Sequence, residues 1–265
     1  MTRGLCIVGL AALTSAAGAG LTDSYTDVTP TGAVVDGILS PGEYGNGAYI
    51  YLGAGGGFGG TLGAGALYFD SDATNLYIGF QPGGNLNDNV TILLDTRAGG
   101  FIDSTMSDTA DGGRRNSTEL ALNTDDPFPN GFFADFSIVI GSFGIVSFEL
   151  TGGSLNFIDY SGVFTGNGTN FREYAISLAS IGTGSNSAID FFAAYISDGG
   201  YASNESIPAS PALQANGNPG FGDGQFGGTI GTPGYENFNR FITVPTPGSL
   251  ALLGLAGLAA GRRRR

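Results

Sequence analysis

Residues 132–152 read FFADFSIVIGSFGIVSFELTG, and this stretch decides the fold class. Within each half, apolar side chains recur at every second position: Phe136, Ile138, Ile140, Val146, Phe148 and Leu150. A period of two places one face of a β-strand in a core and the other face in water. The stretch therefore predicts two half-buried strands.

Strand signals continue on both sides of this stretch. Short runs rich in β-branched and aromatic residues, separated by Gly, Asn, Asp and Pro, indicate strands at 47–53, 65–69, 75–81, 89–96, 118–123, 154–161, 171–179, 188–197 and 237–244. The runs at 89–96 and 190–197 are almost continuously apolar, which is typical of strands buried on both faces. No apolar helical stripe extends over three turns, and residues 177–182 (SLASIG) could form one helical turn.

About ten strands joined mostly by short turns predict an all-β protein, an antiparallel β-sandwich of jelly-roll-like character. Closure of the strands into a barrel is the alternative. Composition does not change between residues 33 and 243, so we expect one domain over 20–243. Two Gly-rich segments, 53–65 and 203–235, are expected to be long loops within it.

Charge and composition exclude several classes of function. The chain has 265 residues, with 48 Gly, one Cys and neither His nor Trp, and all ten basic residues are Arg. Between residues 20 and 243 there are five Arg and all 23 acidic residues, so this region carries a net charge of −18. Such a surface repels nucleic acid and anionic membranes.

Catalytic chemistry is restricted by the same composition. Without His, Lys or a mature Cys, a catalytic triad cannot be built, and only a carboxylate pair remains for general acid–base work. The candidates in or beside apparent strands are Asp95, Glu119, Glu149 and Glu173. Acids are also common on the wet face of a strand. We therefore expect no catalytic residues and no enzyme, with a glycoside hydrolase as the less favoured alternative.

Residues 1–19 have the three parts of a secretory signal peptide. Arg3 precedes an apolar run over 5–13, and small residues at 17–19 match an A-x-A cleavage site. Cleavage there would remove Cys6, so the mature chain would have no thiol. The sequence therefore predicts export.

Residues 244–265 have a comparable order of parts. Val244, Pro245, Thr246 and Pro247 precede the uncharged run 249–261, and the chain ends with Arg262, Arg263, Arg264 and Arg265. The run is shorter than the roughly 20 residues that span a bilayer comfortably, and counting from Val244 makes it a marginal transmembrane helix. The arginines would stay on the cytoplasmic side.

This tail resembles the bacterial PEP-CTERM sorting signal, which an exosortase recognises and processes. Thr246 stands where the family name has Glu. The resemblance implies an exosortase-like partner and delivery to the cell envelope or beyond it, with a transient membrane anchor. A plain membrane anchor is the alternative.

The body resembles carbohydrate-binding module family 9 and DOMON-like β-sandwiches. The similarity lies in VVDGILSPGEYG, GALYFDSDATNLYIGF, VTILLDTRAGG, FREYAISLASIG and DFFAAYIS, in that order. These segments hold an opening Asp-Gly-x-Leu motif and a later strand with a Glu. The family binds sugars through exposed tryptophans, which this chain lacks. The resemblance therefore supports the fold more than the ligand.

Two kinds of site follow from the residue types. Asp70, Asp72 and Asn75 would offer oxygen ligands to Ca²⁺, the candidate cofactor, although the same residues suit a hairpin turn. Loop aromatics could stack on sugars, and they could equally pack onto the edge of the sandwich; these are Tyr44, Tyr201, Phe221 and Tyr235.

Together these features predict an exported bacterial envelope or matrix protein of structural or adhesive role. The alternative is a carbohydrate-binding module, whose partner would be an extracellular polysaccharide. Aromatic side chains exposed together on one sheet face would favour the module.

Overall fold

The computed structural model describes residues 20–28, 32–45, 48–50, 65–100, 108–119, 131–151, 154–164, 170–211, 217–221 and 235–244. These hold fourteen strands, one α-helix and one 3-10 helix. In chain order they are β1 (Gly20–Thr26), β2 (Ala48–Ile50), β3 (Ala66–Ser71), β4 (Asn75–Gln81), β5 (Asn89–Asp95), α1 (Gly112–Glu119), β6 (Phe136–Gly141), β7 (Gly144–Thr151), β8 (Ser154–Ser161), β9 (Val163–Phe164), β10 (Arg172–Ser177), η1 (Leu178–Ile181), β11 (Ala188–Ile196), β12 (Tyr201–Ile207), β13 (Gly220–Phe221) and β14 (Asn237–Ile242).

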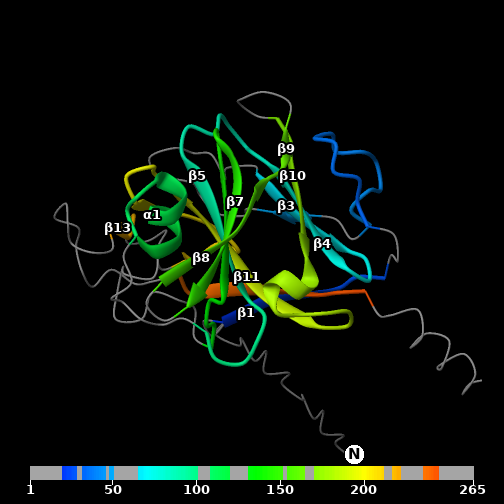
Figure 1. The fold of residues 1–265 in the computed structure, drawn as a ribbon. Coiled ribbons are helices and arrows are strands. Elements are labelled where there is room, and N and C mark those ends of the chain that lie inside the picture. Colours follow the sequence, from blue (N-terminus) through cyan, green and yellow to red (C-terminus); the bar gives the residue numbers. More distant parts are fainter. Residues whose placement is uncertain are drawn as a thin grey trace, which may run out of the picture.

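The strands form two sheets, which confirms the expected sandwich-like, mainly β architecture (Figure 1). The larger sheet has nine strands, with the order β1-β14-β11-β5-β6-β7-β8 and a branch in which β12 pairs with β11 and β13. The smaller sheet has the order β2-β3-β4-β10-β9. From β5 to β8 the chain runs as an antiparallel meander, so neighbours in sequence are neighbours in the sheet.

The main core lies between the two sheets. It is built from alternate side chains of both inner faces, among them Phe69 and Tyr174 from the smaller sheet and Ile138 and Phe191 from the larger one. This confirms the strands at 136–141 and 144–151 that the alternation predicted. They are not half-buried as expected, because all of β6 and all of β7 except Glu149 and Thr151 are buried. The single helical turn expected at 177–182 is present as η1.

The larger sheet is also covered on its outer face. There Leu93 of β5 and Phe192 of β11 pack with Phe132, Tyr235 and other side chains in a second apolar cluster. Every residue of β5 except Asp95 is buried, as the continuous apolar run predicted. Beside this cluster, α1 packs on the outer face against β5, β6 and β7 (Figure 1). The outer face of the larger sheet is therefore covered by α1 and by the side chains of the second apolar cluster.

Three expectations require correction, and one strand was not expected. A strand was expected at 118–123, but Thr118 and Glu119 end α1. The loop expected from residue 203 starts within β12, which reaches Ile207. The N-terminal strand β1 was not expected. It also makes the sheet mixed, because β1 pairs with β14 in parallel.

The predicted ends of the chain lie outside the described ranges. The predicted signal peptide over 1–19 and most of the predicted loop at 53–65 lie outside the described ranges. No helix among the residues that the structure describes is long and apolar enough to cross a bilayer. The transmembrane segment expected within 244–265 is not described beyond Val244.

Candidate functional site

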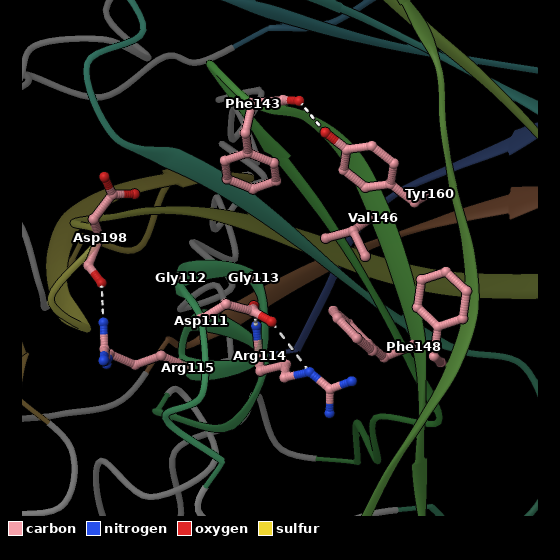
Figure 2. A pocket seen from close by; sticks show the side chains of 11 residues that line it. Asp111, Gly112, Gly113, Arg114, Arg115, Phe143, Val146, Phe148, Tyr160 and Asp198 are labelled. Atoms are coloured by element: carbon pink, nitrogen blue, oxygen red, sulfur yellow. Dashed lines mark hydrogen bonds and ion pairs between the residues drawn. The ribbon is translucent and has the colours of Figure 1, made fainter.

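A pocket of about 520 Å³ lies between α1 and the outer face of β7 and β8 (Figure 2). This volume is within the usual range of small-molecule sites. Helix α1 forms one wall, and the strands form the other. The residues lining the pocket are Asp111, Gly112, Gly113, Arg114, Arg115, Phe143, Val146, Phe148, Phe157, Tyr160 and Asp198.

The strand wall depends on a β-bulge. In the ladder of β7 and β8, Val146 lies opposite Tyr160, Phe148 lies opposite Phe157, and the register shifts just after Ser147. Val146 and Phe148 are two residues apart, so they share a face, and their cross-strand partners share it too. The bulge thereby brings Phe157 and Tyr160, which are three residues apart, to the same face.

The aromatic rings of this wall are open to solvent. Phe157 is 56% exposed, Tyr160 is 57% exposed and Phe143 is 39% exposed. Phe157 meets buried Phe148 edge to face, with ring centroids 6.2 Å apart. Exposed large apolar side chains that gather at a pocket indicate a contact surface, whereas isolated ones do not.

The position of Tyr160 is set by the turn between β6 and β7. Its hydroxyl donates a hydrogen bond to the carbonyl of Phe143, the second residue of that turn (Figure 2). Gly144 follows with φ of 134°, a conformation that side chains rarely adopt, and a Cβ there would lie 3.1 Å from the Tyr160 hydroxyl. A glycine at this position lets the tyrosine ring reach across the turn.

Helix α1 begins at a capping aspartate. The Asp111 side chain accepts a hydrogen bond from the backbone N–H of Arg114 at 2.8 Å, the usual arrangement of an N-cap. The buried residues of α1 are Gly113, Asn116, Ser117 and Thr118, so the helix meets the sheet without any large apolar side chain. A Cβ on Gly113 would lie 2.8 Å from Cγ1 of Val146. The glycine therefore allows α1 to approach β7 closely.

The two arginines of α1 have different partners. Arg114 forms ion pairs with Asp108 at 2.9 Å and with Asp111 at 3.1 Å, and its guanidinium lies 5.6 Å from the ring centroid of Phe148. Arg115 donates instead to two backbone carbonyls, of Asp198 at 2.6 Å and of Thr109 at 3.0 Å. Arg114 is thus neutralised by nearby carboxylates, whereas Arg115 is not.

Asp198 brings a carboxylate to the pocket from the turn between β11 and β12. Its Oδ1 accepts a hydrogen bond from the side-chain amide of Asn89 at 2.8 Å. Its backbone N–H donates to Asp88 at 3.1 Å. These contacts fix the turn beside α1. The pocket therefore combines exposed aromatic rings with charged donors and acceptors.

The sequence-predicted aromatic Tyr44 lies elsewhere and is buried. Its hydroxyl donates to Glu173 Oε1 at 2.9 Å, and the backbone N–H groups of Asp36 and Gly37 donate to Oε2 of the same carboxylate at 2.9 and 2.6 Å. Burial raises the pKa of Glu173 and outweighs these hydrogen bonds. The structure thus joins the Asp-Gly motif to the later Glu, and the ring of Tyr44 is not available for stacking.

Two other predicted aromatics, Tyr235 and Tyr201, lie away from the pocket. Tyr235 is buried and its hydroxyl donates to the carbonyl of Ser203 at 2.8 Å. Tyr201 is half-buried in β12 and lies opposite Phe221 of β13. Neither Tyr235 nor Tyr201 lines the pocket described above, and the side chain of Phe221 lies outside the described part of the structure. Tyr44 and Tyr235 pack into the body of the protein, which was the alternative to stacking on sugars.

Two of the three predicted Ca²⁺ ligands, Asp72 and Asn75, meet at a turn. Asp72 accepts hydrogen bonds from the backbone N–H groups of Thr74 and Asn75, both at 2.7 Å, and from the Tyr77 hydroxyl, also at 2.7 Å. Partial burial alone would raise the pKa of Asp72, but these hydrogen bonds lower it to about 2. Asp70 is buried in β3. Within the described ranges, no group of three acidic, His or Cys side chains is placed to hold a metal.

The carboxylates considered for catalysis are dispersed. Glu149 pairs with Arg97 at 2.8 Å. Asp95 lies opposite Asp190 at the end of β5, where burial raises its pKa to about 6. Glu119 ends α1. Neither these three nor Glu173 is among the described residues that line the pocket, whose acids are Asp111 and Asp198.

Of the predicted sorting motif, only Val244 lies in the described part of the chain. It is buried, and its N–H donates to the hydroxyl of Ser71 at 2.8 Å. That hydroxyl in turn donates to Asp27, the residue after β1, at 2.6 Å. The body of the domain thus extends to Val244. The rest of the motif, 245–247 and 262–265, lies outside the described ranges.

The pocket residues were missed because their signals were indirect. Phe157 and Tyr160 lie in a correctly predicted strand, but strict alternation would place them on opposite faces. The bulge that reverses this leaves no signature in the residue types. Asp111, a good N-cap three residues before Arg114, was the available signal for α1.

Comparison with known proteins finds similarity to a solved structure. No family model matches the chain, and no curated protein matches it. Among solved structures, it is similar to a carbohydrate-binding module of family 9 from Caldicellulosiruptor kristjanssonii, in complex with cellotriose. The two are 12% identical over 84% of this chain and 95% of the other, with a TM-score of 0.40. Similarity at this level says nothing about the ligand of this chain.

Proposed function

We propose that the chain is an exported carbohydrate-binding protein, and that a saccharide occupies the pocket between α1 and β8. The observation that supports this proposal is the exposure of Phe157 and Tyr160 on one face at the pocket. An aromatic face held open to water is costly unless a ligand covers it, and sugar rings present an apolar face of matching shape.

The opposite wall supplies what the sugar hydroxyls need. The carboxylates of Asp111 and Asp198 accept hydrogen bonds, and the guanidinium of Arg115 donates them. A pocket with mainly apolar lining and a few charged groups is typical of small-molecule sites. This site favours the binding module over a purely structural role. Adhesion to an extracellular polysaccharide would be a consequence of binding.

Export belongs to the proposal and is supported by the sequence patterns at 1–19 and 244–265. The signal peptide would deliver the chain through the membrane, and the PEP-CTERM-like tail would present it to an exosortase-like enzyme. The body would then lie at the cell envelope or in the extracellular matrix. A saccharide ligand is abundant in both places.

The test is saccharide binding by ring-deletion variants. The purified full-length chain is screened on a glycan array, and the best ligand is titrated by calorimetry. Phe157→Ala and Tyr160→Ala should each weaken binding roughly tenfold, because each removes a stacking surface. Both side chains are more than half exposed, so the fold should be retained.

Phe133→Ala is the matched control. Phe133 is 41% exposed but does not line the pocket, so its removal should leave the affinity unchanged. A chain that binds no saccharide on the array would contradict the proposal. So would an equal loss of affinity for Phe133→Ala and Phe157→Ala, since that would show a non-specific effect.

A further inference from the structure

Arg115 is an uncompensated cation at the pocket. Its terminal nitrogens donate to the carbonyls of Asp198 and Thr109, at 2.6 and 3.0 Å, and both acceptors are neutral. Among the described residues it forms no ion pair with a carboxylate. Figure 2 shows the carboxylate of Asp198 pointing away from the guanidinium.

Three of the other four arginines of the body form ion pairs with carboxylates, and Arg172 donates to the carbonyl of Asn170 at 2.9 Å. Arg97 forms ion pairs with Asp135 and Glu149, Arg114 with Asp108 and Asp111, and Arg240 with Asp190 through both oxygens. With 23 acidic residues against five arginines, a carboxylate partner is easy to provide. Arg115 therefore differs from these three arginines, because neutral acceptors hold it at the pocket.

The contacts of Arg115 hold it in place and leave donors for a ligand. A guanidinium has five N–H groups, and the two hydrogen bonds use one on each terminal nitrogen. The remaining groups keep the planar fork geometry that matches a carboxylate or a similar oxyanion. The nearby Asp111 carboxylate is already engaged by Arg114 at 3.1 Å.

We propose that the pocket selects an acidic saccharide, a sugar whose carboxylate or sulfate group pairs with Arg115 while its ring covers Phe157 and Tyr160. This inference rests on the proposed carbohydrate function and names the class of ligand. The net charge of −18 repels such a ligand at long range. At physiological ionic strength that repulsion is screened beyond about 8 Å, so the local pair decides the affinity.

The experiment compares matched pairs of short oligosaccharides. Each pair has one neutral sugar and its uronic acid or sulfated counterpart, with the glucose, galactose and mannose series tested in turn. Calorimetry on the full-length chain at physiological ionic strength should show tighter binding of the acidic member. Arg115→Gln should lower that affinity roughly ten- to hundredfold and leave the neutral member unchanged.

Two control variants separate charge from structure. Arg115→Lys keeps the charge and should retain part of the preference for the acidic over the neutral saccharide. Arg97→Gln makes the same change in net charge away from the pocket and should retain all of it. Equal affinity for neutral and acidic members would overturn the inference, and so would an equal loss of both in Arg115→Gln. Both results leave the proposed function intact, whereas binding of no saccharide contradicts the proposed function itself.

Discussion

At the scale of single residues, carboxylates of this body behave in opposite ways because their surroundings differ. Asp95 is half-buried and lies opposite Asp190 in the ladder, whereas Asp72 lies in a turn that directs donors at it. Burial, with the charges of Asp135 and Asp190, raises the pKa of Asp95 to about 6. The hydrogen bonds lower the pKa of Asp72 to about 2.

We expect Asp95→Asn to stabilise the protein at pH 7. A folded pKa of about 6, against an unfolded value near 4, means that the folded state holds a proton that the unfolded state releases. Asp95 therefore lowers stability as pH rises from about 4 to 6. The full shift corresponds to about 3 kcal/mol, which solvent screening of a half-exposed group reduces to about 1 kcal/mol. Asn can still accept the N–H of Phe133.

Urea unfolding at several pH values checks this expectation. The increase in the free energy of unfolding caused by Asp95→Asn should be present at pH 7 and disappear near pH 4. Asp72→Asn provides the opposite case, because Asp72 stabilises above pH 4 and loses this effect as pH falls toward 2. It should destabilise at pH 7. If both variants shift stability in the same direction at pH 7, the raised pKa of Asp95 or the lowered pKa of Asp72 is wrong.

Single residues also show where sequence reasoning reaches its limit. Phe136, Ile138 and Ile140 alternate, and all three are in the core as predicted. Phe157 and Tyr160 also lie in a predicted strand, but their common face depends on a bulge set by the partner strand. Strand type follows from local pattern, whereas register depends on contacts with a distant segment.

At the scale of elements, α1 was missed because its buried surface is polar. Among its described residues, the buried ones are Gly113, Asn116, Ser117 and Thr118, which give no apolar period of 3.6. Strand β12 was missed for the same reason, since it buries Ser203, Glu205 and other polar residues. The elements that complete the outer face were thus the ones that residue patterns could not predict. The core strands, with their apolar alternation, were predictable.

We expect Gly113→Ala to disturb the pocket wall. The new Cβ would lie 2.8 Å from the stiff side chain of Val146, so α1 has to move away from β7. Overpacking of this kind costs about 1–3 kcal/mol, which exceeds the helix propensity gained. Thermal unfolding should show a lower midpoint, and saccharide affinity should fall as well.

Gly112→Ala is the neighbouring control. There the nearest atom, of the Asp198 side chain, lies 3.4 Å from the new Cβ, which is an ordinary contact. The variant should be as stable as the parent chain, or slightly more stable. If both substitutions have the same effect, close approach of α1 to β7 is not what requires the glycine.

At the scale of the whole molecule, we expect the protein at the cell surface to lack both ends. The described body extends from Gly20 to Val244, and both residues are buried. Intact-mass analysis of protein from the envelope should show a start near Gly20 and an end near Pro245. Surface protein that retains Arg262–Arg265 would contradict processing and leave a plain membrane anchor.

The parallel pairing of β1 with β14 has a consequence for when the fold can be completed. Gly20 pairs with Asn237, so the ladder of β1 joins segments more than two hundred residues apart. In the described part of the chain, β14 is the one strand that β1 pairs with. The first strand to leave the ribosome therefore has no partner until almost the whole body has been made. Closing so long a loop is slow, so we expect the chain to stay incompletely folded during synthesis, which is the state that the proposed export through a narrow membrane channel requires.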